Sequence, residues 1–176
     1  MKANQRLARL MNIRSTVLLS GVLLCVAAGS FGPCGVVQAT PSSGFASDTA
    51  TATGVAEINI KSLSPEHQVR LGAKGSSDVH VTINTVQPGG HSGWHTHPGP
   101  SFVVVKSGTA TVYDGDDPSC TPRTIEAGGW FTDPGSGHVH LVRNANSVNL
   151  VLAAFQIVPA GVPRRIDAPD PGFCTF

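Results

Sequence analysis

Apolar and polar residues alternate in several short stretches of this chain, and turn-forming residues separate these stretches. The clearest alternation runs through residues 79–86, where Val79, Val81 and Ile83 share one side and His80 lies on the other. Alternate residues of an extended strand point to opposite faces. The pattern therefore predicts a strand whose Val79, Val81 and Ile83 face the core, with His80 turned outward.

Other short runs of β-forming residues follow at near-regular intervals, and convincing helical periodicity is missing. They cover residues 57–60, 102–105, 109–113, 124–126, 130–132, 138–143 and 148–158. The 20 glycines and 13 prolines place turns between these runs. Many short strands joined by Gly and Pro turns predict an all-β sandwich or small barrel, which we expect as one domain over residues 55–176.

The first 39 residues have the pattern of a secretory signal peptide. Four Lys and Arg residues precede an apolar run over residues 17–29, which is too short to span a bilayer comfortably. Val37 and Ala39 then provide small residues at the two positions that a signal peptidase reads. We predict cleavage after Ala39 and a secreted protein without a stable membrane anchor; an uncleaved N-terminal anchor is the alternative.

Residues 40–54 consist mainly of Ser, Thr, Ala and Gly, with Phe45 as their one aromatic residue. Such a composition offers little apolar surface to bury. It predicts a flexible linker between the signal peptide and the domain.

The cysteines support export. Cys25 and Cys34 lie in the predicted signal peptide, which leaves Cys120 and Cys174. An even number of cysteines in an exported chain indicates a disulfide. This bond would tie the C-terminal tail to a loop in the middle of the domain, and two free thiols are the alternative.

Histidines gather in two segments that also contain glycine. His95 and His97 are two residues apart, so both imidazoles project from the same face of an extended strand. His140 follows in the segment 137–144. Imidazoles that point into one cavity form the beginning of a metal site.

These two segments resemble the two signature motifs of the cupin superfamily. The residues in register with the motifs are Gly89, His95, His97, Gly108, Gly128, Pro134, Gly137, His140 and Asn144, with one extra residue between Pro134 and Gly137. The resemblance implies a single antiparallel jelly-roll barrel. It also implies one divalent metal ion, bound inside the barrel by His95, His97 and His140.

Ser101 stands where the first motif of this superfamily has a glutamate. No Asp or Glu occurs from residue 79 to residue 113, and a carboxylate from Glu126 or Asp133 is the less favoured alternative. Three neutral imidazoles would leave a divalent ion its full charge and several open positions. We expect the ion to be Fe, Zn, Mn, Cu or Ni, and anionic small molecules to be attracted to it.

Three further residues are candidates for the pocket. His138 lies two residues before His140, so both side chains would point to the same side of a strand. His138 is either an additional ligand or a residue of the barrel mouth. His91 has the parity of His95 but lies at a turn. Ser101 either contacts a metal-bound water or only fills space.

The sequence thus predicts a secreted cupin-type protein that binds a divalent metal and a small-molecule ligand. One hypothesis is a metal-dependent oxygenase-type enzyme acting on a small organic substrate. The alternative is a non-catalytic module that binds a small molecule or a metal. The family resemblance also suggests a homodimer. From residue 40 on, three Lys and five Arg stand against eleven acids, a net charge of −3 without a basic cluster, so nucleic-acid binding is not expected.

Overall fold

The computed structural model describes residues 38–176, which form strands, turns and loops and contain no helix. The strands are β1 (Ser43–Val55), β2 (Ile58–Leu63), β3 (Gln68–Ala73), β4 (Ser77–His91), β5 (His95–Thr96), β6 (Ser101–Ser107), β7 (Thr109–Asp114), β8 (Arg123–Glu126), β9 (Trp130–Asp133), β10 (His140–Arg143), β11 (Leu150–Pro159) and β12 (Ile166–Asp167). The all-β prediction is confirmed. The described residues include no helix capable of crossing a bilayer. The signal peptide predicted for residues 1–39 lies almost entirely outside them.

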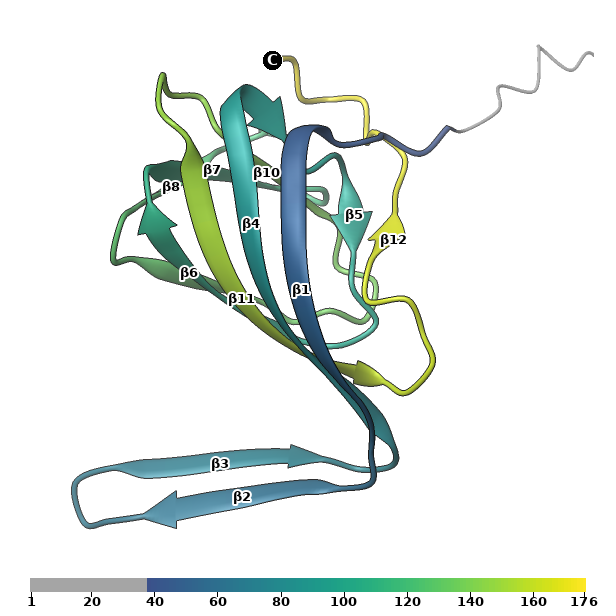
Figure 1. Ribbon diagram of the computed structural model, residues 1–176. Coiled ribbons are helices and arrows are strands. Elements are labelled where there is room, and N and C mark those ends of the chain that lie inside the picture. The colour runs from purple at the N-terminus through teal and green to yellow at the C-terminus, as the bar shows by residue number, and fades with distance from the viewer. Residues whose placement is uncertain (1–37) are drawn as a thin grey trace, which may run out of the picture. The chain divides into compact units, whose positions relative to one another are not determined.

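Ten of these strands form one antiparallel sheet that curls into a near-closed barrel (Figure 1). One half has the order β1–β4–β11–β6–β9, and the other has the order β12–β5–β10–β7–β8. The long strand β4 connects the halves, because its last residue, His91, pairs with Arg143 of β10. This arrangement agrees with the predicted antiparallel jelly-roll barrel.

Apolar side chains fill the part of the barrel interior where β4 ends and β11 begins. The buried members of this core are Val86, Val103, Val105, Ala110, Val112, Phe131, Val142, Leu150, Leu152 and Ala154. Phe45 of β1 and Ile125 of β8 pack against them. Removing this apolar surface from water stabilises the barrel by about 25 cal/mol for each Å² buried. The other part of the interior is left for polar groups.

Strand β1 shows that the flexible linker predicted for residues 40–54 is wrong. β1 pairs with β4 from Ser43, opposite His91, to Val55, opposite Ser77. Its Ser, Thr and Ala side chains are mostly exposed, as their composition suggested. The backbone nevertheless satisfies the hydrogen bonds along one edge of β4, and burial of side chains is not needed for that pairing.

The side-chain orientation predicted for β4 is also wrong. His80, Thr82 and Asn84 are buried inside the barrel, whereas Val81 is 51% exposed and Ile83 is 37% exposed on the outside. The ring of His80 is held by Thr51 of β1, whose Oγ1 lies 2.8 Å from its Nδ1. Period-two alternation locates the two faces of a strand but does not say which face is inside.

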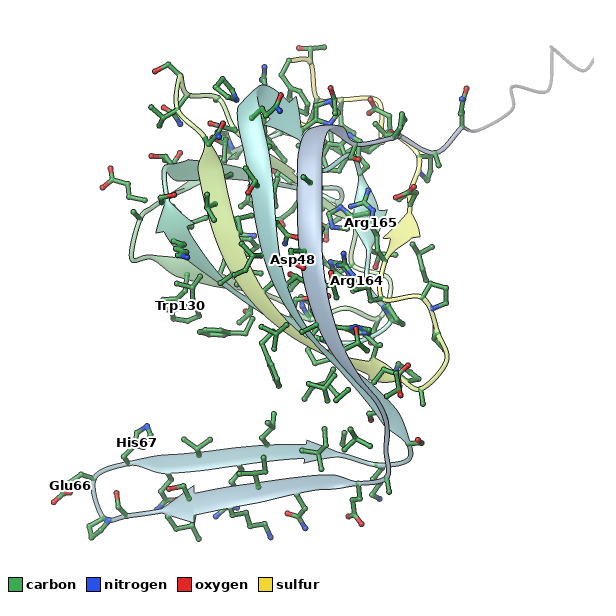
Figure 2. All side chains as sticks on the ribbon, in the orientation of Figure 1. Asp48, Glu66, His67, Trp130, Arg164 and Arg165 are labelled. Atoms are coloured by element: carbon green, nitrogen blue, oxygen red, sulfur yellow. A yellow bond between two sulfur atoms is a disulfide. The ribbon has the colours of Figure 1, made fainter. Side chains whose placement is uncertain are left out.

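Strands β2 and β3 form a hairpin, residues 58–73, which we call the arm. It projects from the ends of β1 and β4 that lie away from His91 (Figure 1). The arm ends in a turn in which the backbone N–H of Ser64 donates to the carbonyl of His67 at 2.9 Å. His67 is exposed there (Figure 2). Within the described part of the chain, β2 and β3 pair only with each other.

The predicted disulfide between Cys120 and Cys174 is confirmed. It joins the loop between β7 and β8 to the C-terminal tail. The tail lies over Trp94, which is buried outside the barrel with Leu141 and Ala168. The backbone N–H of Ala168 donates to the carbonyl of Trp94 at 2.9 Å. The disulfide therefore holds the tail beside the strand that carries His95.

Replacing both Cys120 and Cys174 with serine is expected to lower the free energy of unfolding by about 4 kcal/mol. The reason is that the unfolded chain gains the freedom of a loop that spans 54 residues. A loss of this size corresponds to a fall in melting temperature of roughly 10–15 °C. Chemical and thermal denaturation of the metal-free proteins without reductant measure it. Equal stability of the two proteins would contradict the prediction.

Candidate metal centre

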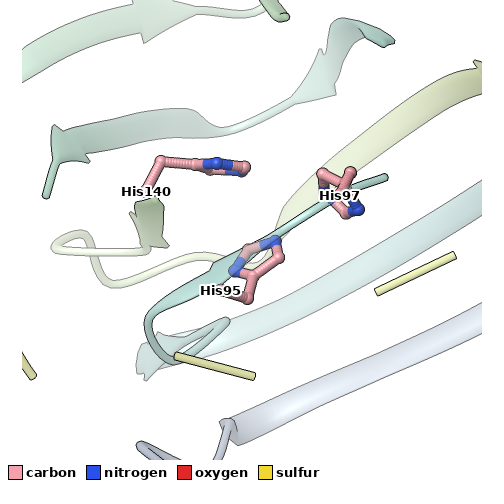
Figure 3. Close-up of side chains that lie close together, drawn as sticks. All are labelled: His95, His97 and His140. Atoms are coloured by element: carbon pink, nitrogen blue, oxygen red, sulfur yellow. The ribbon is translucent and has the colours of Figure 1, made fainter. Parts of the chain in front are cut away.

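Three histidine side chains converge inside the barrel (Figure 3). His95 lies on β5 and pairs with His140 at the start of β10, while His97 follows β5 directly. The ring centroids are 4.9 Å apart for His95 and His97, 4.3 Å for His95 and His140, and 5.4 Å for His97 and His140. One nitrogen of each ring lies within 4.8 Å of the other two, and all three residues are buried. We call these residues the histidine cluster.

Backbone carbonyls determine which ring nitrogen carries the proton. Nδ1 of His95 lies 2.9 Å from the carbonyl oxygen of Gly93, and Nδ1 of His97 lies 2.6 Å from that of Arg164. A carbonyl oxygen only accepts, so each Nδ1–H donates and the lone pair falls on Nε2. Metal-binding histidines are usually oriented in this way by a hydrogen bond from the second ring nitrogen.

Asp133 of β9 approaches the third histidine. Its Oδ1 lies 3.7 Å from Nδ1 of His140 and 2.8 Å from Nδ1 of His138. The Oδ2 of Asp133 and the Nδ1 of His140 are buried and have no hydrogen-bond partner among the described residues. Because a buried carboxylate oxygen without a partner is costly, this side of the pocket favours a bound cation or donor.

Ser101 and Asp133 lie directly opposite each other on the paired strands β6 and β9. Ser101 is buried, and its hydroxyl accepts a hydrogen bond from Nε2 of Gln156 at 2.8 Å. The position at which the first motif of the cupin superfamily has a glutamate is therefore neutral. A carboxylate reaches the same pocket from the adjacent strand.

The other sequence-predicted candidates lie outside the histidine cluster. His138 is a quarter exposed, stacks on His140 with a centroid distance of 5.8 Å, and lies 3.5 Å from Asp114. It forms a second potential metal-binding group with Asp133 and His140. His91 accepts a hydrogen bond from the backbone N–H of Gly93 at 3.1 Å and does not line the pocket. Glu126 is exposed on β8.

Burial lowers the pKa of each histidine in the cluster, because the protonated form loses its hydration. For His95 the nearby imidazole of His140 lowers the pKa further. The pKa of His97 is lowered in the same direction. That of His140 falls to about 4, although Asp133 opposes the shift. The rings are therefore neutral near pH 7, as metal ligands must be.

Two arginines from the C-terminal segment line the same pocket, beside Gln156. Figure 2 places Arg164 and Arg165 next to each other, between β1 and β12. Arg164 donates to Oε1 of Gln156 at 3.4 Å and to Oγ of Ser47 at 3.2 Å. Arg165 is paired with Asp167 at 2.7 Å, whereas Arg164 has no acidic partner in the part of the chain that the structure describes. The pocket thus combines neutral imidazoles with the carboxyl group of Asp133 and two guanidinium groups.

Sequence reasoning did not single out Gln156, Arg164 and Arg165, because nothing local shows that the tail passes the barrel mouth. The alternation of side chains along β9 could have indicated Asp133 as a pocket residue. It lies two residues after Phe131, and an apolar Phe131 facing inward places Asp133 inside as well.

A near-closed antiparallel barrel with histidines converging in its interior defines a β-barrel protein with a candidate metal centre. Residues 82–157 match the family model of the cupin domain, so this segment of the chain is a cupin domain. The family assignment made from the motifs is thereby confirmed. No curated protein sequence matches the chain.

Among solved structures, the chain is similar to a putative sugar phosphate isomerase from Acidithiobacillus ferrooxidans, with 22% identity, 45% of this chain and 49% of that chain covered, and a TM-score of 0.39. An uncharacterized protein with a double-stranded β-helix domain from Klebsiella pneumoniae is 18% identical, with 67% and 84% covered and a TM-score of 0.43. An oxalate oxidase is 22% identical, with 46% and 45% covered and a TM-score of 0.40. The chain spans about half of the isomerase and the oxidase. These similarities do not identify a substrate.

The metal-free protein is expected to lose stability as the pH falls from 7 to 4. Below pH 6.5 the unfolded chain binds protons at the cluster histidines while the folded barrel does not, because the folded pKa values are lower. For His140 alone the loss by pH 4 is on the order of 3 kcal/mol. Urea denaturation at several pH values measures it. The pH slope should be smaller for His140→Gln than for the wild type and for the control His67→Gln in the arm; equal slopes for all three proteins would contradict the assignment.

Proposed function

We propose that this protein binds one divalent metal ion through His95, His97 and His140, and that it uses the ion on a small anionic organic molecule. The observation that carries the proposal is the convergence of three buried, neutral imidazoles. In two of them a backbone carbonyl fixes the proton on Nδ1 and leaves Nε2 for a ligand bond. In His140 the side of Nδ1 faces Asp133, which leaves Nε2 for the same purpose.

The donor set favours a transition metal. Imidazole nitrogens suit Fe, Zn, Cu and Ni, and Mn fits a site that also has a carboxylate. The bound ion would act as a Lewis acid or redox centre with coordination positions open to a substrate. The proposed reaction class is an oxygenase-type transformation.

We propose Asp133 as the carboxylate that compensates for Ser101. Its buried Oδ1 faces Nδ1 of His140 and would orient that ring, as carboxylates beside metal-bound histidines do. Its unpartnered Oδ2 would offset part of the charge of the ion. Asp133 would then supply the negative charge, while the hydroxyl of Ser101 accepts a hydrogen bond from the amide of Gln156.

The lining of the pocket supports an anionic ligand of small size. Arg164 and Arg165 add positive charge beside the cluster. The cavity has a volume of about 50 Å³. This is room for roughly three to five water molecules, or for an ion and a ligand of a few non-hydrogen atoms. Small carboxylates meet both conditions.

Secretion is proposed on two grounds. The N-terminal sequence has the features of a signal peptide, and a disulfide closes the C-terminal tail onto the barrel. Disulfides persist in oxidising compartments and are rare in the cytosol.

The metal-stripped chain, offered Fe, Zn, Mn, Cu or Ni in turn, is expected to bind close to one ion per chain of at least one metal. His95→Ala, His97→Ala and His140→Ala should each reduce the bound metal to a small fraction of that amount. His67→Ala in the turn of the arm serves as the matched control and should bind like the wild type. Elemental analysis after gel filtration measures the content. A wild type that binds none of the five metals would refute the proposal.

Substitution of Asp133 by asparagine is expected to weaken metal binding by about 10- to 100-fold, the usual effect of losing a carboxylate that orients a ligand. Asp133→Glu should restore part of the affinity. Asp114→Asn is the matched control, because Asp114 also contacts His138 but does not line the pocket. Competition with a chelator, together with the absorption bands of the cobalt-loaded protein, reports both affinity and ligand geometry. Wild-type affinity in Asp133→Asn would remove Asp133 from the centre while leaving the cluster intact.

Oxygen consumption then separates an enzyme from a binding module. The loaded wild type would be tested with small carboxylates, diols and diketones, and His97→Ala is the inactive reference. Binding of metal without turnover of any substrate would favour the non-catalytic alternative.

A further inference from the structure

Five large apolar side chains lie exposed on the outside of one half of the barrel. They are Val81, Ile83, Phe102, Trp130 and Phe155, with exposed fractions of 51, 37, 44, 61 and 37%. We call them the patch. Figure 2 shows Trp130 on the outer side of the barrel.

The register of the sheet makes the patch continuous across four strands. Val81 of β4 lies opposite Phe155 of β11, which lies opposite Phe102 of β6. In the next row, Ile83 is followed by Ala153, Val104 and Trp130 in the same way. The rings of Phe102 and Trp130 stack with their centroids 5.4 Å apart. Single exposed apolar residues are ordinary, but a continuous patch marks an interaction surface.

The arm has a second apolar surface, on which Ile60 is 56% and Val69 is 40% exposed while Ile58 is buried. Ile58 pairs with Ala73 and Ile60 with Leu71, and alternation places Val69 on the same face of the hairpin. We call this the apolar face of the arm. Its opposite face carries Lys61 and Arg70, which also pair with each other. An amphipathic hairpin of two strands is marginally stable in water, so its apolar face needs a cover.

The apolar face of the arm continues into a groove between the arm and the C-terminal end of β11. Leu71 and Ala73 form one wall, and Ile157 and Pro159 of β11 belong to the other. The groove has a volume of about 260 Å³. Phe155 of the patch and Ile157 of the groove lie on the same strand, two residues apart, so the patch and the groove adjoin each other.

We propose that the patch is the docking surface for the arm of a second copy of this chain, and that two copies exchange arms about a two-fold axis. A specific interface buries about 800 Å² on each partner. An aromatic side chain buries at most about 150–250 Å², so the three partly exposed aromatics of the patch do not reach this area alone. An exchange lets each copy contribute both its patch and its arm. One chain carries both surfaces, which is what a self-complementary two-fold interface requires.

Two pairs of matched substitutions test the exchange on the full chain. Ile60 and Leu63 are almost equally exposed, at 56 and 58%, but lie on opposite faces of β2. Ile60→Asp is expected to raise the dimer dissociation constant by about 30-fold or more, the effect of losing a central interface residue, whereas Leu63→Asp leaves it unchanged. On the barrel, Trp130→Asp should act like Ile60→Asp. Val148→Asp, at a residue that is 60% exposed in the loop before β11, should leave the dimer intact.

Sedimentation velocity and light scattering at micromolar concentrations give the mass and the dissociation constant. The wild type should have twice the chain mass, and circular dichroism should show the same fold for every variant. The apolar N-terminal run is present in all of them, so differences arise from the substitutions. A monomeric wild type would overturn the proposal. So would dimers that persist in both Ile60→Asp and Trp130→Asp, or a loss of dimer that is equal for Ile60→Asp and Leu63→Asp.

Discussion

The constraint on which this structure depends is the strict division of every barrel strand into an inner and an outer face. The interior of a small closed barrel is limited, and each strand alternates between the two sides. On β4 the inner side begins with His80, Thr82 and Asn84 and ends with Val86 in the apolar core. The apolar core holds the barrel together at one end and leaves space for polar chemistry at the other. The same alternation puts Val81 and Ile83 outside, so the polar interior and the apolar exterior have one cause.

The candidate metal centre also depends on parts of the chain that are distant in sequence. The carbonyl of Arg164 fixes the tautomer of His97, and Gln156 of β11 lies between Ser101 and Arg164. Arg164 lies two residues before β12, which pairs with β5, and the disulfide at Cys174 holds the tail beyond it. The tail thus does more than cover the barrel. It supplies the hydrogen bond that orients His97, and the disulfide keeps the tail in place.

Much of this could be predicted from the sequence, because it rests on short-range patterns. The spacing of His95 and His97 gave their common face, the motifs gave His140 as their partner, and the two cysteines gave the disulfide. The errors arose where a local pattern has two physical solutions. The composition of residues 40–54 correctly indicates little side-chain burial, yet a backbone can complete a sheet edge without it. The alternation on β4 is real, but the choice of the inner side depends on strands far away in sequence. Arg164 and Gln156 reach the pocket through such long-range contacts, so no local pattern indicated them.

This chain has Ser101 where the first motif of the cupin superfamily has a glutamate. The difference has a physical consequence that goes beyond the absence of one ligand. A buried divalent ion surrounded only by neutral imidazoles would keep its full charge, and two arginines line the same pocket. Asp133 is the buried acid that lines it. Because Asp133 is the cross-strand partner of Ser101, moving the carboxylate from β6 to β9 retains one negative charge within the pocket. It also brings that charge to the Nδ1 side of His140, where in the proposed centre it would orient the ring instead of occupying a coordination position. Under the proposed function, a site built this way would keep positions free for an anionic molecule, and Ser101 would change the chemistry of the site without abolishing it.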